Sequence, residues 1–154
     1  MRFFVGSDHA GVDLRKQLVE SLRERGHEIG AEIGPDAPDE RVDYPDMASA
    51  VCRHVLAEPD SFGLLVCGTG QGVAMAANRF SGIRAGCVAD IFSARMIRAH
   101  NDANVLCLGA RVLGSGLATA LLEAFCETTF EGGRHADRVA KLDVSSSASG
   151  AASG

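Results

Sequence analysis

The chain has 154 residues, of which 46% are hydrophobic and 23% charged, and its formal net charge at pH 7 is -5. These values are typical of one soluble domain with a sizeable core, and an acidic chain without a Lys/Arg run argues against nucleic-acid or anionic-membrane binding. No stretch is apolar and long enough to span a membrane, and the N-terminus enters a strand-like run at once, so we expect no signal peptide.

The first half of the chain predicts two strands and two helices in alternation. Leu14, Leu18 and Leu22 form one apolar helical stripe, and Gly26 is placed to end that helix. Pro45 suits the first turn of the second helix. The expected elements are a strand at 2–6, a helix at 12–25, a weaker strand at 27–33 interrupted at Gly30, a loop at 34–43 and a helix at about 43–57.

The second half continues the alternation. A short apolar run at 62–67 predicts a buried parallel strand that ends in Cys67. The elements expected after it are a helix from 73 to about 80, a strand at 82–88, a helix at 91–99, a strand at 105–108 and a helix at 115–127. Strands that alternate with helices predict an α/β fold with a parallel sheet and helices on both faces.

The C-terminal part differs in composition from the rest. Residues 128–142 are polar and basic, and predict a short arm outside the core; the family resemblance described below implies that this arm contacts a partner subunit. Residues 143–154 are almost entirely Ser, Ala and Gly after Val144, and predict a disordered tail. We therefore expect a single domain over residues 1–142.

The cysteines and histidines lack the spacing of a metal site. The chain has five cysteines and five histidines, and no two cysteines form a CxxC pair. The odd number and wide spacing of the cysteines argue against a disulfide framework or a structural zinc site, and suit a reduced cytoplasm. We expect a cytoplasmic protein without a metal ion.

Cys67 stands where open α/β sheets bind their ligands, at the carboxyl end of a strand. Gly68, Gly70 and Gly72 follow it at alternate positions, and allow a tight turn whose N–H groups form an anion-binding nest. A cysteine that faces a helix N-terminus favours the thiolate, which acts as a base or nucleophile. The alternative is that Cys67 is simply a small buried apolar residue.

Other polar residues divide between the two edges of the predicted sheet. Asp8 and His9 follow the first strand and Arg111 follows the fifth, so both positions lie at the carboxyl edge. His100 and Asn101 precede the fifth strand, which puts them at the opposite edge of one chain. They reach the cysteine only through a loop excursion or from a second subunit.

Each of these residues also has an ordinary structural interpretation. Asp8 suits a helix N-cap, and Thr69 suits a turn hydroxyl. The remaining interpretations are a surface histidine for His9, a half-buried core residue for Tyr44, a solvated turn for 100–102, and surface charges for Arg134 and Arg138. Taken together, these residues suit a phosphorylated ligand, because they combine a thiolate, a nest, an Asp/His pair and several arginines.

The motifs of this chain resemble the ribose-5-phosphate isomerase B family, which also contains galactose-6-phosphate and allose-6-phosphate isomerases. They occur in the right order from Gly6 to Arg138, and their joint occurrence is specific. The matching segments are 6–11 (GSDHAG), 43–45 (DYP), 67–70 (CGTG), 76–78 (AAN), 82–85 (GIRA), 93–95 (SAR), 100–106 (HNDANVL), 109–112 (GARV) and 132–135 (GGRH) with Arg138.

The resemblance implies a Rossmann-like, three-layer α/β/α sandwich on a five-stranded parallel sheet. It implies a homodimer whose active sites are shared across the interface, sometimes paired into a tetramer, with the His100 loop supplied by the partner subunit. It also implies no metal and no organic cofactor.

The resemblance further implies an aldose–ketose isomerisation through a cis-enediolate, with Cys67 as the general base. The N–H groups from Gly68 to Gly72, including Gly70 and Gln71, would stabilise the enediolate oxygen with help from Thr69. His100 would open the sugar ring. The implied substrate contacts are Asp8, Asn101 and Tyr44 for the hydroxyls, and His9, Arg111, Arg134 and Arg138 for the phosphate.

Three alternatives remain at this level. The first is the same chemistry on another phosphosugar, because Gln71 and Ala74 stand where the family more often has an aliphatic residue and a serine. The second is a phosphosugar-binding module without catalysis, which would need only the arginines. The third is a thiol redox enzyme, which the absence of a resolving cysteine at CxxC spacing disfavours.

Overall fold

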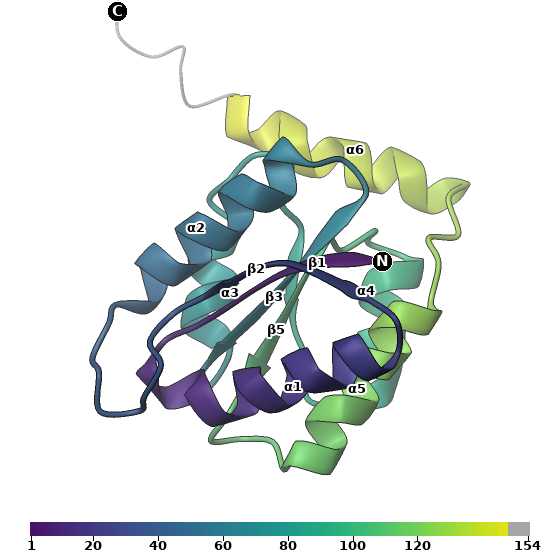
Figure 1. Cartoon of the computed structure of the whole chain (residues 1–154). Helices are drawn as coiled ribbons and strands as arrows, with labels where there is room; N and C mark the ends of the chain where they lie inside the picture. The colour runs from purple at the N-terminus through teal and green to yellow at the C-terminus, as the bar shows by residue number, and fades with distance from the viewer. Residues whose placement is uncertain (148–154) are drawn as a thin grey trace, which may run out of the picture.

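The structure is a computed structural model that describes residues 1–147. Its centre is a parallel sheet of five strands in the order β2-β1-β3-β5-β4, with helices on both faces (Figure 1). The predicted fold class is confirmed. The elements are β1 (Arg2–Ser7), η1 (His9–Gly11), α1 (Val12–Glu24), β2 (Glu28–Ile33), α2 (Tyr44–Ala57), β3 (Ser61–Cys67), α3 (Gln71–Ala77), β4 (Ala85–Cys87), α4 (Ile91–Ala99), β5 (Val105–Gly109), α5 (Ser115–Glu127) and α6 (Arg134–Ser147).

The sheet is buried from both sides, as a parallel sheet requires. Alternate residues of β3 divide between two cores: Leu64 packs with residues of α1 and α5, whereas Leu65 packs with residues of α2 and α3. Both leucines are fully buried. Two apolar layers therefore hold the central strands rigidly, and the strand ends have fixed positions. Within residues 1–147, no helix combines the length and the apolar character needed to cross a bilayer.

Two glycines act as the sequence predicts. Gly26 has a φ of +77° after α1, and the bonds from Gly26 N to Arg23 O and from His27 N to Leu22 O close a Schellman motif. In β2 the register with β1 skips Gly30, because Phe3 pairs with Ile29 and Phe4 with Ala31. The interruption at Gly30 is thus a bulge within a continuous strand.

Helix α3 is shorter than predicted, ending at Ala77 rather than near residue 80. The reason is the side chain of Asn78, whose amide nitrogen donates to Ala85 O while its oxygen accepts from Ala85 N, both at 2.9 Å. This pairing mimics a backbone ladder and ends the helix beside the start of β4. Strand β4 itself is correspondingly short, at Ala85–Cys87 instead of 82–88.

The C-terminal segment differs most from prediction. Residues 128–133 are irregular, but the chain then forms helix α6, which continues past the predicted boundary at residue 142 (Figure 1). The helix thus includes residues 143–147 of the tail expected from 143 onward, and residues 148–154 lie outside the described part. Asp143 accepts a hydrogen bond from Gly82 N at 3.1 Å, and His135 is buried, so α6 is packed against the domain.

Candidate active site

The carboxyl ends of β1, β3 and β5 meet at one edge of the sheet. Cys67 pairs with Gly109 in the ladder, and Asp8 N donates to Val66 O at 3.3 Å. Just past the strands, Ala110 N donates to Cys67 O and Arg111 N donates to Gly68 O, both at 2.9 Å. These backbone bonds bring the residues predicted after three different strands into one place.

Cys67 is nearly buried, with 4% of its surface exposed. Its Sγ accepts a hydrogen bond from Gly70 N at 3.2 Å. Gly70 can direct its N–H at the sulfur because it adopts a left-handed conformation (φ +80°) immediately before α3. A backbone donor aimed at a sulfur stabilises negative charge there.

The nest has fewer free donors than predicted. Gly70 N is used by Cys67, and Gln71 N donates to Thr69 Oγ1 at 3.4 Å. In the described part of the chain, the N–H groups of Gly68, Thr69 and Gly72 donate to no protein acceptor. The predicted nest therefore keeps three amides for an oxyanion at this turn, those of Gly68, Thr69 and Gly72.

Three further predicted side chains lie at this edge. The Tyr44 ring packs on Gly72 so closely that a Cβ on that glycine would lie 2.8 Å from Tyr44 Cε2. The Arg111 guanidinium extends over Gly68, where Nη1 would be 3.5 Å from a Cβ. His9 is held by Val42 O, 3.3 Å from its Nδ1.

Asp8 caps a short helix with one of its two carboxylate oxygens. Its Oδ1 accepts hydrogen bonds from Ala10 N at 2.9 Å and Gly11 N at 3.2 Å, which confirms the capping interpretation for the short helix η1. Within residues 1–147, Asp8 Oδ2 accepts no hydrogen bond. The cap thus fixes the carboxylate while one oxygen remains available at the edge where Cys67 lies.

The other predicted residues gather at the opposite edge. Helix α4 returns from the end of β4, so His100 lies at its C-terminal cap. His100 and Asn101 line a cavity of about 290 Å³ together with His135 and Arg138. Within one chain the structure keeps these residues away from Cys67. This agrees with the prediction, which placed His100 and Asn101 at the opposite edge because they precede the fifth strand.

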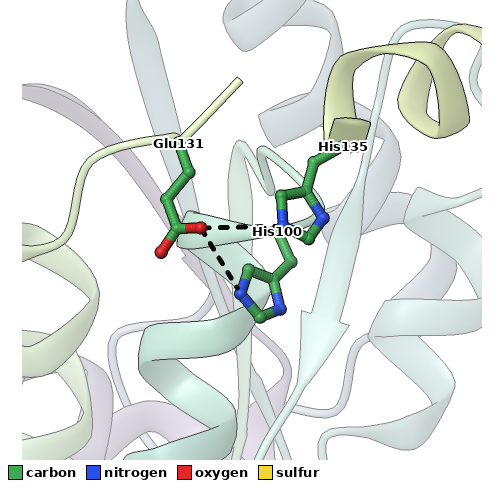
Figure 2. Close-up of side chains that lie close together, drawn as sticks. All are labelled: His100, Glu131 and His135. Carbon is green, nitrogen blue, oxygen red and sulfur yellow. Dashed lines mark ion pairs between the residues drawn. The ribbon is translucent and has the colours of Figure 1, made fainter. Parts of the chain in front are cut away.

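Two residues of this second group were not singled out from the sequence. Glu131 Oε2 lies 3.7 Å from His100 Nε2 and 3.6 Å from His135 Nε2. Figure 2 marks both ion pairs with dashed lines. His135 appeared only as part of the 132–135 motif. The detectable signal was the i, i+4 spacing of Glu131 and His135, but the intervening Gly132 and Gly133 suggested a loop.

This group offers metal-ligand atoms but not the geometry of a metal site. The ligand atoms of His100, Glu131 and His135 lie within 4.8 Å of one another. The two imidazole rings, however, are stacked with centroids 4.2 Å apart and planes at 8°. Since a metal ion lies near the plane of each imidazole that binds it, two stacked rings cannot direct their lone pairs at one ion.

The other cysteines are poor nucleophiles. Burial raises the pKa of Cys52 to about 12 and that of Cys126 to about 11. Burial also raises the pKa of Cys107 and Cys87, and neighbouring thiols add to the effect. These four are neutral thiols at pH 7, which leaves Cys67 as the candidate for thiolate chemistry.

Comparison with known proteins shows which family this chain resembles in sequence and in structure. Residues 3–142 match the model of a family described as Ribose/Galactose Isomerase. Ribose-5-phosphate isomerase B from Escherichia coli is 44% identical over 134 residues, 87% of this chain and 89% of that protein. The structure of ribose-5-phosphate isomerase B from Clostridium thermocellum is 40% identical, with a TM-score of 0.93 over 97% of this chain and 99% of that one.

A second solved structure carries a ligand. It is ribose-5-phosphate isomerase B from Mycoplasma genitalium with bound ribulose-5-phosphate. Its chain is 37% identical, and the two chains superpose with a TM-score of 0.90 over 95% of this chain and 96% of that one.

Proposed function

Because this chain belongs to the ribose/galactose isomerase family, we propose that it interconverts ribose 5-phosphate and ribulose 5-phosphate. The observation that carries the proposal is the hydrogen bond from Gly70 N to Cys67 Sγ at the carboxyl edge of the sheet. A phosphosugar-binding module needs cationic side chains but no thiol held by a backbone donor. The contact therefore favours catalysis over binding alone.

Cys67 is the proposed general base. It takes the proton from C2 of the open-chain aldose and returns it at C1, which leaves a cis-enediolate between the two steps. The negative charge that develops on the sugar oxygen is stabilised by the free N–H groups of Gly68, Thr69 and Gly72, with the Thr69 hydroxyl beside them. Loss of one such donor costs about a hundred- to a thousandfold in kcat.

The substrate contacts follow from the same edge. Asp8 Oδ2 and the Tyr44 hydroxyl suit sugar hydroxyls, and His9 and Arg111 suit the phosphate. Gln71 faces the neighbouring cavity, which it lines together with Ala74. The size of that cavity would decide whether a sugar with a sixth carbon fits. The alternative reaction is therefore the same isomerisation of a six-carbon or four-carbon phosphosugar.

A second copy of the chain completes the proposed site. His100, Asn101, Arg134 and Arg138 belong to the opposite edge in one subunit, although ring opening and phosphate binding require them near Cys67. A homodimer in which the edges of two subunits meet, or a tetramer of two such dimers, supplies them from the partner. The proposal includes neither a metal nor an organic cofactor, and its setting is the cytoplasm.

The test is proton NMR of ribose 5-phosphate in D2O with the wild-type protein and the Cys67→Ala variant. We expect ribulose 5-phosphate from the wild type alone, while Cys67→Ala still binds the substrate with an affinity close to that of the wild type. Deuterium at C1 of the ketose supports the enediolate route. Turnover by Cys67→Ala at a near-native rate would remove Cys67 as the base, and a wild type without ketose formation would overturn the substrate assignment.

A further inference from the structure

One carboxylate lies close to two stacked imidazoles at the amino-terminal edge of the sheet. Glu131 Oε2 lies 3.7 Å from His100 Nε2 and 3.6 Å from His135 Nε2. The imidazole planes are nearly parallel, at 8°, with centroids 4.2 Å apart. Figure 2 shows Glu131 beside the pair, with its carboxylate directed at both rings.

Backbone contacts fix this arrangement. Glu131 N donates to Ala99 O at 3.0 Å, which ties the Glu131 segment to the last turn of α4 next to His100. Gly132 and Gly133 then turn the chain with φ values of +65° and +55°, so that α6 starts immediately and returns His135 to the same place. His100 and His135 therefore meet because of the main chain, with the carboxylate between the two segments.

The charges around the pair limit how many protons it holds. Burial lowers the pKa of His135, and His100, Arg134 and Arg138 lower it further, whereas Glu131 acts in the opposite direction. Two stacked imidazolium ions would repel each other strongly, in a place where two arginines are already positive. Glu131 is the carboxylate that faces both rings, so it is the group that favours a proton there.

We propose that Glu131 is a positioning residue that keeps one proton on the His100–His135 pair, ready for His100 to donate during ring opening. This inference rests on the proposed function, in which His100 opens the cyclic sugar phosphate. His100 gives its N–H proton to the ring oxygen as the bond from that oxygen to C1 breaks. The C1 hydroxyl gives its proton to Asp8 or water and becomes the aldehyde, so protons and electrons balance.

The role requires the charge of Glu131 and not only its shape. Glu131→Gln keeps the size and hydrogen-bonding ability of the side chain but removes the charge that favours an imidazolium. Glu127→Gln is the matched control, because Glu127 is an exposed acidic residue at the end of α5 and has no ion pair in the described part. Glu131→Asp keeps the charge and should restore part of the activity.

The test compares a reaction that needs ring opening with one that does not. Ribose 5-phosphate is mostly cyclic in water, whereas ribulose 5-phosphate cannot close a five-membered ring because its O5 carries the phosphate. Conversion of ribose 5-phosphate therefore requires ring opening. Exchange of the C1 proton of ribulose 5-phosphate in D2O requires only the base and the enediolate.

For Glu131→Gln we expect kcat/KM for ribose 5-phosphate at pH 8 to fall about tenfold, with the high-pH limb of its profile about one unit lower. The rate of C1 deuteration of ribulose 5-phosphate should stay within about twofold of wild type, and Glu127→Gln should match wild type in both assays. Melting temperatures report whether each variant is folded.

Four results would overturn the proposal. Equal losses in both assays would show that Glu131 acts on the whole site or on its folding. Full activity of Glu131→Gln with ribose 5-phosphate, at an unchanged pH profile, would show that its charge is irrelevant, and a wild type that falls in activity with EDTA would point to a bound metal. A wild type inactive in both assays would overturn the proposed function, and the role of Glu131 with it.

Discussion

At Gly70, conformation and space both exclude a side chain. The residue has a φ of +80°, and a Cβ there would lie 2.8 Å from Cys87 Sγ and 2.9 Å from the carbonyl carbon of Leu108. Gly70→Ala should lower the free energy of unfolding by roughly 3 kcal/mol, the sum of left-handed strain and overpacking. The shifted Gly70 N–H would no longer reach Cys67, and kcat should fall about ten- to a hundredfold.

The matched control is Gly116→Ala in the first turn of α5. No atom lies within 4 Å of a Cβ built there, and alanine favours the helix, so this variant should gain about 0.5–1 kcal/mol and keep full activity. Urea denaturation and steady-state kinetics measure both effects. A Gly70→Ala protein as stable and active as wild type would show that the Gly70 contact with the sulfur is not required.

Among the structural elements, β2 and the loop after it depend on a buried cation from α1. Arg15 is 1% exposed. It donates to Ser7 Oγ at 2.9 Å and to Pro35 O at 2.7 Å, and its Nε lies 3.1 Å from Glu32 Oε1. One guanidinium thus joins α1 to the end of β1, to β2 and to the loop.

Arg15→Ala should cost about 3 kcal/mol in the free energy of unfolding, because buried acceptors lose their donor and Glu32 loses its partner. The next residue provides the control: Lys16 is exposed and also donates to that loop, at Asp36 O, but Lys16→Ala should cost less than about 1 kcal/mol. Equal midpoints for the two variants in urea denaturation would contradict the role assigned to Arg15.

Elements with strong local patterns were predictable, and those set by distant contacts were not. The stripe of Leu14, Leu18 and Leu22 was sufficient to predict α1, and the apolar run before Cys67 to predict β3. The end of α3 depends on Asn78 pairing with Ala85, which no local pattern reveals. Helix α6 was missed because two glycines precede it, and because its Ser-rich C-terminal turn has the composition of a disordered tail.

The order of strands and helices predicted which site residues lie together better than the residue types did. The rule that ligands bind at the carboxyl ends of parallel strands was enough to group Asp8, Cys67 and Arg111. The same rule correctly separated His100 from Cys67. It gave no indication of Glu131, because the contact with His100 depends on how the Gly132–Gly133 turn directs α6.

The whole molecule carries two sets of polar residues at opposite edges of one rigid sheet. Cys67, with its backbone donor, lies at the carboxyl edge, and His100, with its carboxylate, lies at the other. The two central apolar layers leave no hinge within the sheet that could bring the edges together. If one reaction needs both residues, they must come from different copies of the chain.

This requirement can be tested by mixing two inactive variants. Cys67→Ala lacks the proposed base and His100→Asn lacks the proposed ring-opening group, so we expect each variant alone to be inactive with ribose 5-phosphate. In a mixed dimer, one site combines the native Cys67 of one subunit with the native His100 of the other. Random exchange makes about half of the dimers mixed, each with one working site, so the mixture should regain about a quarter of wild-type activity.

Subunit exchange is achieved by joint refolding from urea, with each variant refolded alone as the control. Restored activity requires that Cys67 and His100 of one site belong to different subunits, since a site within one chain would stay inactive in every combination. A refolded mixture without activity, in which native mass spectrometry shows mixed dimers, would reject the shared site. The two edges would then serve separate functions, and ring opening would have to be assigned to a group at the carboxyl edge, where Asp8 supplies a carboxylate.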